Sequence, residues 1–310
     1  MKVGFIGLGL MGRGMANGLL KGGVDLLVND ISADAKAALV TAGATGATDL
    51  AELTRAVDVI FTSLPGPAEV EQVVFGPGGI IENLQSEQVM FDLTTSSREM
   101  ACKIDAAFRS RGAWFLDAPV SGGPAGAASG DLAIWVGGER AVYDRHLDLL
   151  KKVGRMPRHV GPVGAGTVVK LAHNMSGYMI MASLAEVFSV ATKAGVDPLE
   201  LWEAMHLGMV GRASPMDMLV RQFLPGAYEP PAFALRLAHK DVALGTLMAR
   251  ELGVPMRIAN MTFAEMTEAL GRGWGNQDSR AFLKLQLERA GVQIAVEPER
   301  LARAVEDAKR

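Results

Sequence analysis

Short apolar runs alternate with segments of helical period through the first half of the chain. The runs lie at residues 2–6, 26–30, 58–64, 88–92, 113–117 and 132–136, and helical patterns separate most of them. Strands that alternate with helices in this way are typical of an α/β, doubly wound sheet. We therefore predict such a domain over residues 1–163.

Turn-forming residues follow three of these runs, at residues 64–67, 93–97 and 118–124. The carboxyl ends of parallel strands meet at one edge of a sheet, where ligands collect. We expect the three loops to line one crevice.

The second half of the chain carries a different pattern. Beyond Gly166, long segments of helical period rich in Ala, Leu and Met replace the strands, so we predict an all-helical domain over residues 164–310. The segment 167–194 would form one helix about 42 Å long at 1.5 Å per residue, and Gly195 and Pro198 would end it. A helix so apolar needs cover from the rest of this half or from a second subunit. Dimerisation through this half is therefore an expectation.

Residues 175–191 are nearly free of charge and have to be compared with a membrane span. Glu186 interrupts the stretch, and Lys170 and Lys193 flank it closely. The uninterrupted apolar part is shorter than the roughly 20 residues that cross a bilayer. We expect a buried helix of a soluble protein and no membrane partner.

Composition disfavours several classes of protein. A chain of 310 residues that is 49% hydrophobic can bury the cores of two domains. A net charge of -3, without basic runs interleaved with aromatics, disfavours nucleic-acid binding. Cys102 is the only cysteine, and no Cys/His cluster has the spacing of a metal site. Because the N-terminus also lacks the pattern of a secretory signal, we expect a cytoplasmic protein without a metal.

The first apolar run leads into a G-x-G-x-x-G turn formed by Gly7, Gly9 and Gly12. In such a turn the first glycine allows the tight bend, the second lets the backbone approach a pyrophosphate, and the third lets helix and strand pack closely. The helix that follows directs its positive end and free N–H groups at the same place, which suits a phosphate. We predict that the turn, with Leu8, Leu10 and Met11 between its glycines, binds a dinucleotide.

An acid stands where the second strand ends. Asn29 and Asp30 close that strand, and Asp30 lies 18 residues beyond Gly12, where a carboxylate can bind the ribose hydroxyls of an adenosine. The same carboxylate would repel the 2′-phosphate of NADP, and no Arg follows it closely. NAD is therefore favoured over NADP.

The segment from Asp117 to Gly130 leaves a strand end and supplies two adjacent glycines after a hydroxyl. The backbone N–H groups of Gly122 and Gly123, with the hydroxyl of Ser121, could form a nest for a substrate carboxylate. A flexible Gly/Ser loop without a ligand is the alternative.

Lys170 and Asn174 lie four residues apart and would project from the same face of a helix. Val, Leu and Ala surround Lys170 in sequence, and burial among them would lower its pKa and make a neutral amine available. A lysine that exchanges a proton with an alcohol oxygen is what hydride transfer requires. His173 competes for the role of base and ranks second, and a lysine that merely reaches out to solvent is the alternative.

Together these segments resemble the beta-hydroxyacid dehydrogenase family, which includes 3-hydroxyisobutyrate dehydrogenase and tartronate semialdehyde reductase. The resemblance runs from Lys2 to about Leu287 and is most specific at Asp117–Gly130. It implies a Rossmann domain followed by an all-helical domain, assembled as a homodimer or homotetramer.

The resemblance also implies roles for single residues. Ser121, Gly122 and Gly123 would hold the substrate carboxylate, Lys170 would be the catalytic acid/base, and Asn174 would orient the substrate. Lys240 resembles the family lysine that reaches toward the cofactor, although its neighbour Asp241 could also pair with it. Leu64, Pro65 and Thr95 would line the nicotinamide side.

The expected activity is NAD-dependent hydride transfer to or from a short hydroxy acid or its semialdehyde. A tartronate semialdehyde reductase is the first alternative. An imine reductase shares the architecture but typically lacks a lysine at the position of Lys170, and a non-catalytic NAD-binding protein would have no reason to keep Ser121, Lys170 and Asn174 together.

Overall fold

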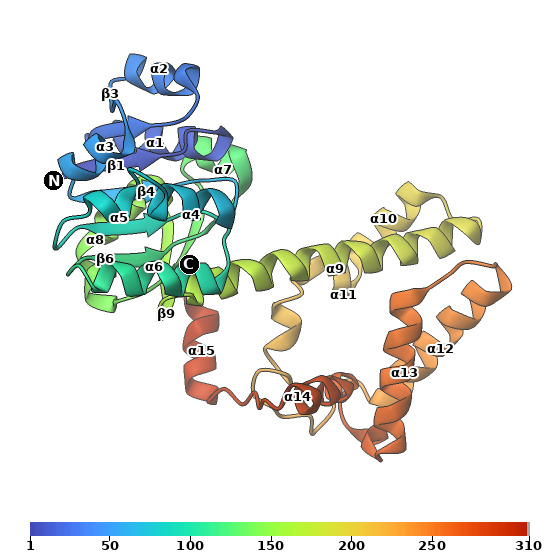
Figure 1. Ribbon diagram of the computed structural model, residues 1–310. Coiled ribbons are helices and arrows are strands. Elements are labelled where there is room, and N and C mark those ends of the chain that lie inside the picture. The colour runs from blue at the N-terminus through green and yellow to red at the C-terminus, as the bar shows by residue number, and fades with distance from the viewer. Residues whose placement is uncertain (309–310) are drawn as a thin grey trace. The chain divides into compact units, whose positions relative to one another are not determined.

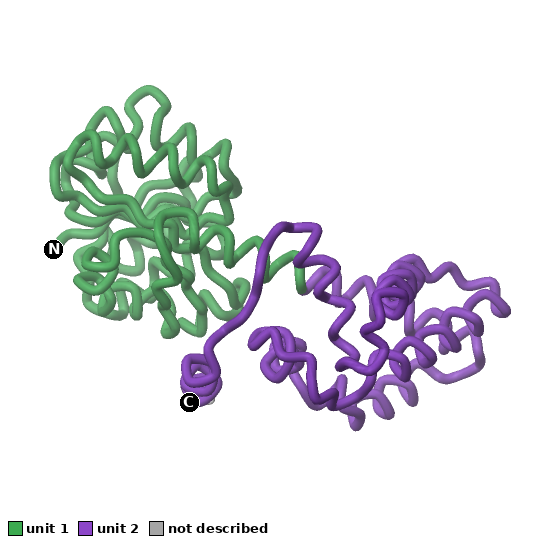
Figure 2. The backbone as a smooth tube through the Cα atoms, turned by 90° about the horizontal axis from the view of Figure 1, so that it is seen from below, with its two compact units in different colours: residues 1–176 green, residues 177–310 purple. Residues whose placement is uncertain are grey.

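The computed structural model describes residues 1–308 and contains two compact units, Met1–Ser176 and Gly177–Arg310 (Figures 1 and 2). The boundary between the two units falls inside helix α9 (Ala165–Lys193), because this continuous helix begins in unit 1 and ends in unit 2.

Unit 1 contains a nine-stranded sheet in the order β3-β2-β1-β4-β5-β6-β8-β7, with β9 paired to β8. The strands are β1 (Lys2–Ile6), β2 (Asp25–Asn29), β3 (Thr45–Gly46), β4 (Val59–Thr62), β5 (Val89–Asp92), β6 (Trp114–Asp117), β7 (Val120–Ser121), β8 (Ala133–Gly137) and β9 (Met156–Gly161). The pairs from β3 to β6 are all parallel, whereas β8 pairs antiparallel with both β6 and β7. The order reverses between β1 and β4, which is where a doubly wound sheet opens a crevice for a ligand.

Helices cover both faces of this sheet (Figure 1). They are α1 (Leu10–Lys21), α2 (Ala33–Thr41), α3 (Leu50–Ala56), α4 (Pro67–Phe75), α5 (Ile80–Asn83), α6 (Arg98–Arg109), α7 (Gly123–Ser129) and α8 (Arg140–Val153). Residues of α1 and α8 share one hydrophobic cluster with one face of the strands, and residues of α3 to α6 share a second cluster with the other face. The predicted α/β class is therefore confirmed.

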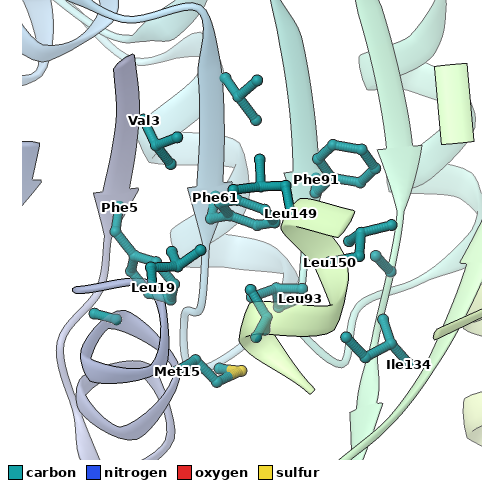
Figure 3. Packing of buried hydrophobic residues seen from close by; sticks show 14 of the residues in the cluster. Val3, Phe5, Met15, Leu19, Phe61, Phe91, Leu93, Ile134, Leu149 and Leu150 are labelled. Carbon is teal, nitrogen blue, oxygen red and sulfur yellow. The ribbon is translucent and has the colours of Figure 1, made fainter. Parts of the chain in front are cut away.

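Three phenylalanines form the centre of the first cluster. Phe5, Phe61 and Phe91 come from β1, β4 and β5, and their ring centroids lie 6.1 and 5.4 Å apart in sequence order. Met15 and Leu19 of α1 pack in the same cluster (Figure 3). Successive residues of a strand face opposite sides of the sheet, so this stack fixes which residues at the strand ends face the crevice.

Unit 2 is helical, with no strand among its described residues 177–308. Its elements are α10 (Pro198–Leu207), α11 (Met209–Arg212), η1 (Asp217–Leu219), α12 (Leu235–Glu251), α13 (Arg257–Gly271), η2 (Trp274–Asn276), η3 (Ser279–Leu283), α14 (Lys284–Ala290) and α15 (Pro298–Asp307). Small clusters around Leu235, Leu285 and Val190 hold it together.

Helix α9 is, among the described residues, the one helix long and apolar enough to cross a membrane by length and composition. Glu186 is the single acid of this helix. Its carboxylate accepts hydrogen bonds from the backbone N–H groups of Ile258 and Ala259 and so caps the start of α13. The expected burial of this helix is wrong for a single chain, since Tyr178 is 70% and Met179 62% exposed.

Candidate active site

A cavity of about 910 Å³ lies in unit 1 at the carboxyl edge of the parallel strands. Strand register brings the ends of β4, β5 and β6 side by side there, with Thr62 opposite Asp92 and Asp92 opposite Asp117. The loops after these three strands all contribute to the wall, so the expectation that they line one crevice is confirmed.

Half of the wall consists of residues that the sequence pointed to. These are Gly7, Gly9, Leu10, Met11, Gly12, Asn29, Asp30, Leu64, Pro65, Thr95, Gly123 and Lys170. The other half had no predicted role as single residues, although Leu93, Thr94 and Val120 belong to the loops expected at the crevice. It comprises Ile6, Ile31, Leu50, Ser63, Glu69, Gln72, Val73, Gly76, Pro77, Leu93, Thr94 and Val120. Most of the second group are apolar residues without a motif, so only their place in the fold could have revealed them.

The three glycines of the turn answer different spatial needs. Gly7 has φ +90°, and a Cβ there would lie 2.3 Å from the carbonyl oxygen of Ser63, while a Cβ on Gly12 would lie 1.9 Å from the carbonyl oxygen of Gly7. The protein itself therefore excludes a side chain at Gly7 and Gly12. A Cβ on Gly9 would meet nothing within 4 Å, so the space beside Gly9 suits the close approach of a ligand.

The start of α1 borders the same cavity and offers a site for an anion. No side chain caps this helix at Gly9, and its first turn carries no acid. The N–H groups of the first turn and the positive end of the helix are therefore available to a phosphate. The residues present fit the pyrophosphate of a dinucleotide.

Asp30 lines the cavity and also braces the glycine-rich turn. One carboxylate oxygen accepts a hydrogen bond from the N–H of Leu8 at 2.5 Å, and the other accepts one from the N–H of Ser32 at 2.7 Å. Leu8 itself is 2% exposed and does not line the cavity. Asp30 thus fixes the turn to the end of β2 and keeps negative charge at the cavity wall.

A buried hydrogen-bonded chain joins the loops after β4 and β5. Asp92 accepts hydrogen bonds from the hydroxyl of Thr62 at 2.8 Å and from the N–H of Thr94 at 3.1 Å. The hydroxyl of Thr94 in turn accepts one from the N–H of Leu64 at 3.0 Å. Burial raises the pKa of Asp92 to about 6, although these hydrogen bonds act in the opposite direction.

Lys170 lies in the second turn of α9, is half-buried, and reaches the same cavity as the glycine-rich turn. Burial lowers its pKa below the ordinary value of a lysine. A lysine with this property at a cavity wall can release and accept a proton more readily than a lysine in solvent.

The predicted carboxylate nest lies beside the cavity and lines it only in part. Gly122 and Gly123 have φ of +140° and +63°, and they lie where β7 leads into α7, of which Gly123 is the first residue. Gly123 and Val120 line the cavity, whereas Ser121 and Gly122 do not. Only one of the three predicted nest residues is therefore brought to the wall that Lys170 shares.

His173 and Asn174 do not line the cavity. The ring of His173 lies 5.1 Å from that of Trp135 between centroids, and its Nδ1 lies 3.2 Å from Oδ1 of Asn174. These contacts direct His173 to the ring of a strand residue, which favours Lys170 as the base. The predicted role of Asn174 stays a prediction.

The sequence predicts no role for Asp117 beyond its place at the start of the segment 117–130. In the structure its carboxylate binds the start of the helix that carries Lys170. It is 2% exposed, and its carboxylate accepts hydrogen bonds from the N–H groups of Gly164 at 2.6 Å and Thr167 at 2.7 Å. Burial raises its pKa, and these two backbone donors oppose that effect. An acid at the end of a strand was the only signal in the sequence.

Lys240 lies in unit 2 on α12, where its Nζ is 2.9 Å from a carboxylate oxygen of Asp241. Both side chains are more than half exposed. The pairing that the sequence left open is thus present, and a part for Lys240 at the cofactor stays a prediction. No group of three His, Cys, Asp or Glu side chains able to hold a metal occurs within residues 1–308.

Comparison with known proteins agrees with this geometry. Residues 2–164 match the family model described as the NAD binding domain of 6-phosphogluconate dehydrogenase. Residues 164–286 match the one described as the NAD-binding region of NADP-dependent 3-hydroxyisobutyrate dehydrogenase. Together the two matches cover almost the whole chain.

Relatives of similar length carry names from one class of enzyme. The 2-(hydroxymethyl)glutarate dehydrogenase of Eubacterium barkeri is 34% identical over 295 residues, which are 95% of this chain and 98% of that protein. The 3-hydroxyisobutyrate dehydrogenase of Pseudomonas aeruginosa is 33% identical over 80% of this chain and 85% of its own length.

Solved structures share the fold over most of the chain. The 3-hydroxyisobutyrate dehydrogenase of Salmonella typhimurium aligns with a TM-score of 0.60 at 28% identity, over 92% of this chain and 99% of that one. An imine reductase of Myxococcus stipitatus in complex with NADP+ aligns with a TM-score of 0.78 at 19% identity, over 92% and 99% of the two chains, and this likeness concerns the fold alone. From the glycine-rich turn, the cavity and the identity to these relatives, the chain belongs to the beta-hydroxyacid dehydrogenase family of NAD(P)-dependent enzymes that act on the hydroxyl groups of hydroxy acids.

Proposed function

We propose that this chain interconverts a short hydroxy acid and its carbonyl form, with Lys170 as the general acid/base. The observation that carries the proposal is that a half-buried lysine of lowered pKa lines the same cavity as the dinucleotide turn. Bound NAD would supply the hydride acceptor, and reduced NAD the hydride donor. Each turnover also moves one hydroxyl proton, for which the protein has to provide a base.

The part of the protein in the reaction is the transfer of a proton by Lys170, which lines the cavity. In the oxidation direction the neutral amine of Lys170 would take the hydroxyl proton of the substrate, while NAD held at the glycine-rich turn would supply the hydride acceptor. In the reduction direction the ammonium of Lys170 returns that proton to the carbonyl oxygen. Partial burial favours the first step because it lowers the pKa of Lys170 and so makes the neutral amine easier to form.

We propose NAD as the preferred cofactor. Asp30 presents a carboxylate at the cavity wall, where it can accept hydrogen bonds from the ribose hydroxyls and would repel a 2′-phosphate. No arginine lines the cavity among residues 1–308, so no guanidinium there would offset that repulsion.

The substrate class that we propose is a short hydroxy acid or semialdehyde related to 3-hydroxyisobutyrate, with tartronate semialdehyde as the first alternative. The names of the relatives, 2-(hydroxymethyl)glutarate and 3-hydroxyisobutyrate dehydrogenase, share a carboxylate near a hydroxyl-bearing carbon. Of the turn at Ser121, Gly122 and Gly123, the last residue lines the cavity, where backbone N–H groups of the turn could bind such a carboxylate.

We also propose that the chain works as a homodimer or homotetramer. Several large apolar side chains of α9 are open to solvent in one chain, with Tyr178 70%, Met179 62% and Met181 58% exposed. Apolar surface of this extent on one helix is the kind that a second copy covers. A monomeric mass in solution scattering would contradict this.

One screen tests the reaction class. Short 2- and 3-hydroxy acids with NAD, and the corresponding semialdehydes with NADH, are followed by absorbance at the nicotinamide band, with a cyclic imine as a separate arm. We expect turnover with at least one hydroxy acid or semialdehyde and none with the imine. Turnover with the imine alone, or with no compound although NADH binds, would overturn the proposal.

A further inference from the structure

We propose that Asp117 is a positioning residue of this enzyme, which sets the place of Lys170 by capping the start of α9 from the end of β6. The inference rests on the proposed role of Lys170 for its kinetic consequences, whereas its structural part stands by itself. It concerns a residue at the back of the cavity that does not line the wall.

Both oxygens of the Asp117 carboxylate accept hydrogen bonds at the start of α9, one from the residue before the helix and one from its first turn. Oδ1 accepts the N–H of Gly164 at 2.6 Å, and Oδ2 accepts the N–H of Thr167 at 2.7 Å. A helix leaves its first N–H groups without partners inside the helix, and acids placed there are favoured by hydrogen bonding and by the helix dipole. Here the cap comes from a segment 47 to 50 residues away, so it ties two distant parts of the chain together.

Two glycines bring the partners close enough for these bonds. A Cβ on Gly166 would lie 2.2 Å from the carbonyl oxygen of Trp135 and 2.7 Å from that of Asp117. A Cβ on Gly137 would lie 2.5 Å from Oδ1 of Asp117. The first turn of α9 is therefore pressed against β6 and β8 and has no room to shift inward.

Lys170 follows Thr167 by three residues on the same helix, hence on nearly the same face one turn further on. Because a helix is stiff over one turn, the anchor at Thr167 also fixes the Cα of Lys170. Asp117 meanwhile begins the segment in which Val120 and Gly123 line the cavity. One buried carboxylate thus joins the helix of the acid/base to the loop that faces the substrate.

Amide hydrogen exchange tests the structural part without any substrate. The full-length chain is compared with Asp117→Ala and Gly166→Ala, and the control is Gln88→Ala. Gln88 is also buried and donates to the carbonyl oxygens of Thr54 and Val57, both at 2.6 Å. It precedes the first residue of β5 and therefore lies at the amino ends of the parallel strands, away from the cavity. We expect exchange in residues 164–170 to rise about tenfold in the first two variants, since each loses or displaces a buried cap. The Gln88 variant should leave that segment at the wild-type rate.

Kinetics test whether the anchor acts through Lys170. Asp117→Ala and Gly166→Ala should each lower kcat by about 100-fold, with the dissociation constant of NADH within about twofold. Asp117→Asn keeps one acceptor oxygen and should recover part of that loss. In a Lys170→Ala background, Asp117→Ala should cost little more, because the group that it positions is already gone.

The outcomes separate this inference from the proposed function. Wild-type exchange rates in residues 164–170 of both Asp117→Ala and Gly166→Ala would overturn the anchoring role. Raised exchange with unchanged kcat, or a full additional loss in the Lys170→Ala background, would overturn the positioning of Lys170. If Lys170→Ala itself keeps turnover, the proposed acid/base fails, and the exchange rates still decide whether Asp117 holds the start of α9.

Discussion

The carboxylate of Asp117 lies 2.7 Å from the backbone nitrogen of Thr167, fifty residues further along the chain. Through this bond the end of a central strand caps the helix that carries the proposed acid/base. Asp92, the register partner of Asp117 on the neighbouring strand, holds the loops after β4 and β5 in a similar way. Two buried aspartates that do not line the cavity therefore hold the segments that do, and the residues at the wall remain available to ligands.

The glycine-rich turn yields a matched pair of variants. Gly9→Ala should fold with unchanged thermal stability, because its Cβ would meet no protein atom within 4 Å, but it should weaken NADH binding at least about tenfold by keeping the pyrophosphate away. Gly12→Ala should lower thermal stability as well, since its Cβ would lie 1.9 Å from the carbonyl oxygen of Gly7. Thermal melts and fluorescence titration with NADH measure both effects. Undiminished NADH binding by Gly9→Ala would show that the dinucleotide lies elsewhere.

Asp30 should control the choice between NAD and NADP. In Asp30→Ala the N–H of Leu8 loses its acceptor and the cavity loses a charge, so NADH should bind about tenfold more weakly while the preference over NADPH disappears. Dissociation constants for both cofactors provide the measurement. Asp34→Ala, which removes an exposed acid from the first turn of α2, is the control for charge alone. If the NADH to NADPH ratio stays at its wild-type value in Asp30→Ala, the basis for preferring NAD is lost.

Asp92 should make stability fall as the pH rises through mildly acidic values. Its pKa is about 6 in the fold against 3.8 without it, so the folded state binds more protons than the unfolded state between these values and is favoured at the lower pH. Asp92→Asn retains an acceptor for Thr62 and Thr94 but cannot titrate. From pH 4 to pH 7 the free energy of unfolding of the wild type should fall by roughly 2 kcal/mol relative to that of the variant. Urea unfolding of both proteins at several pH values gives this difference, and parallel curves would contradict it.

The two directions of the reaction should depend on pH in opposite ways. Oxidation requires the neutral amine of Lys170 and reduction its ammonium form. Because burial lowers the pKa of Lys170, kcat for oxidation should rise and kcat for reduction should fall through a common pH below the usual range of a lysine. Profiles that rise or fall together in both directions would point to a different group.

Much of the fold was predictable because it depends on local patterns. The apolar runs mark the strands from β1 to β8 in most cases, and the helix expected over residues 167–194 is observed at Ala165–Lys193. Strand β9 (Met156–Gly161) was not predicted, because Pro157, Arg158 and His159 interrupt its apolar character. Its place next to β8 comes from tertiary pairing and not from its own composition.

The candidate site divides in the same manner. Gly7, Asp30 and Lys170 could be predicted because glycine spacing, an acid at a strand end and a lysine among apolar residues can be read from the sequence alone. The roles of Asp92 and Asp117 were not, because each depends on partners that the fold brings from distant segments. Large apolar side chains of α9, such as Tyr178 and Met179, are exposed in one chain, so of the two expected kinds of cover, that from a second subunit stays a prediction.

The central claim is tested most directly by the turnover of Lys170→Ala, compared with His173→Ala, on whichever hydroxy acid or semialdehyde the screen identifies. Lys170→Ala should lose about 10²–10⁴-fold in kcat while it binds NADH within about twofold of the wild type. His173→Ala should keep kcat within about threefold, because its ring packs on Trp135 and lies off the cavity wall. Wild-type turnover by Lys170→Ala, together with loss of turnover by His173→Ala, would contradict the account.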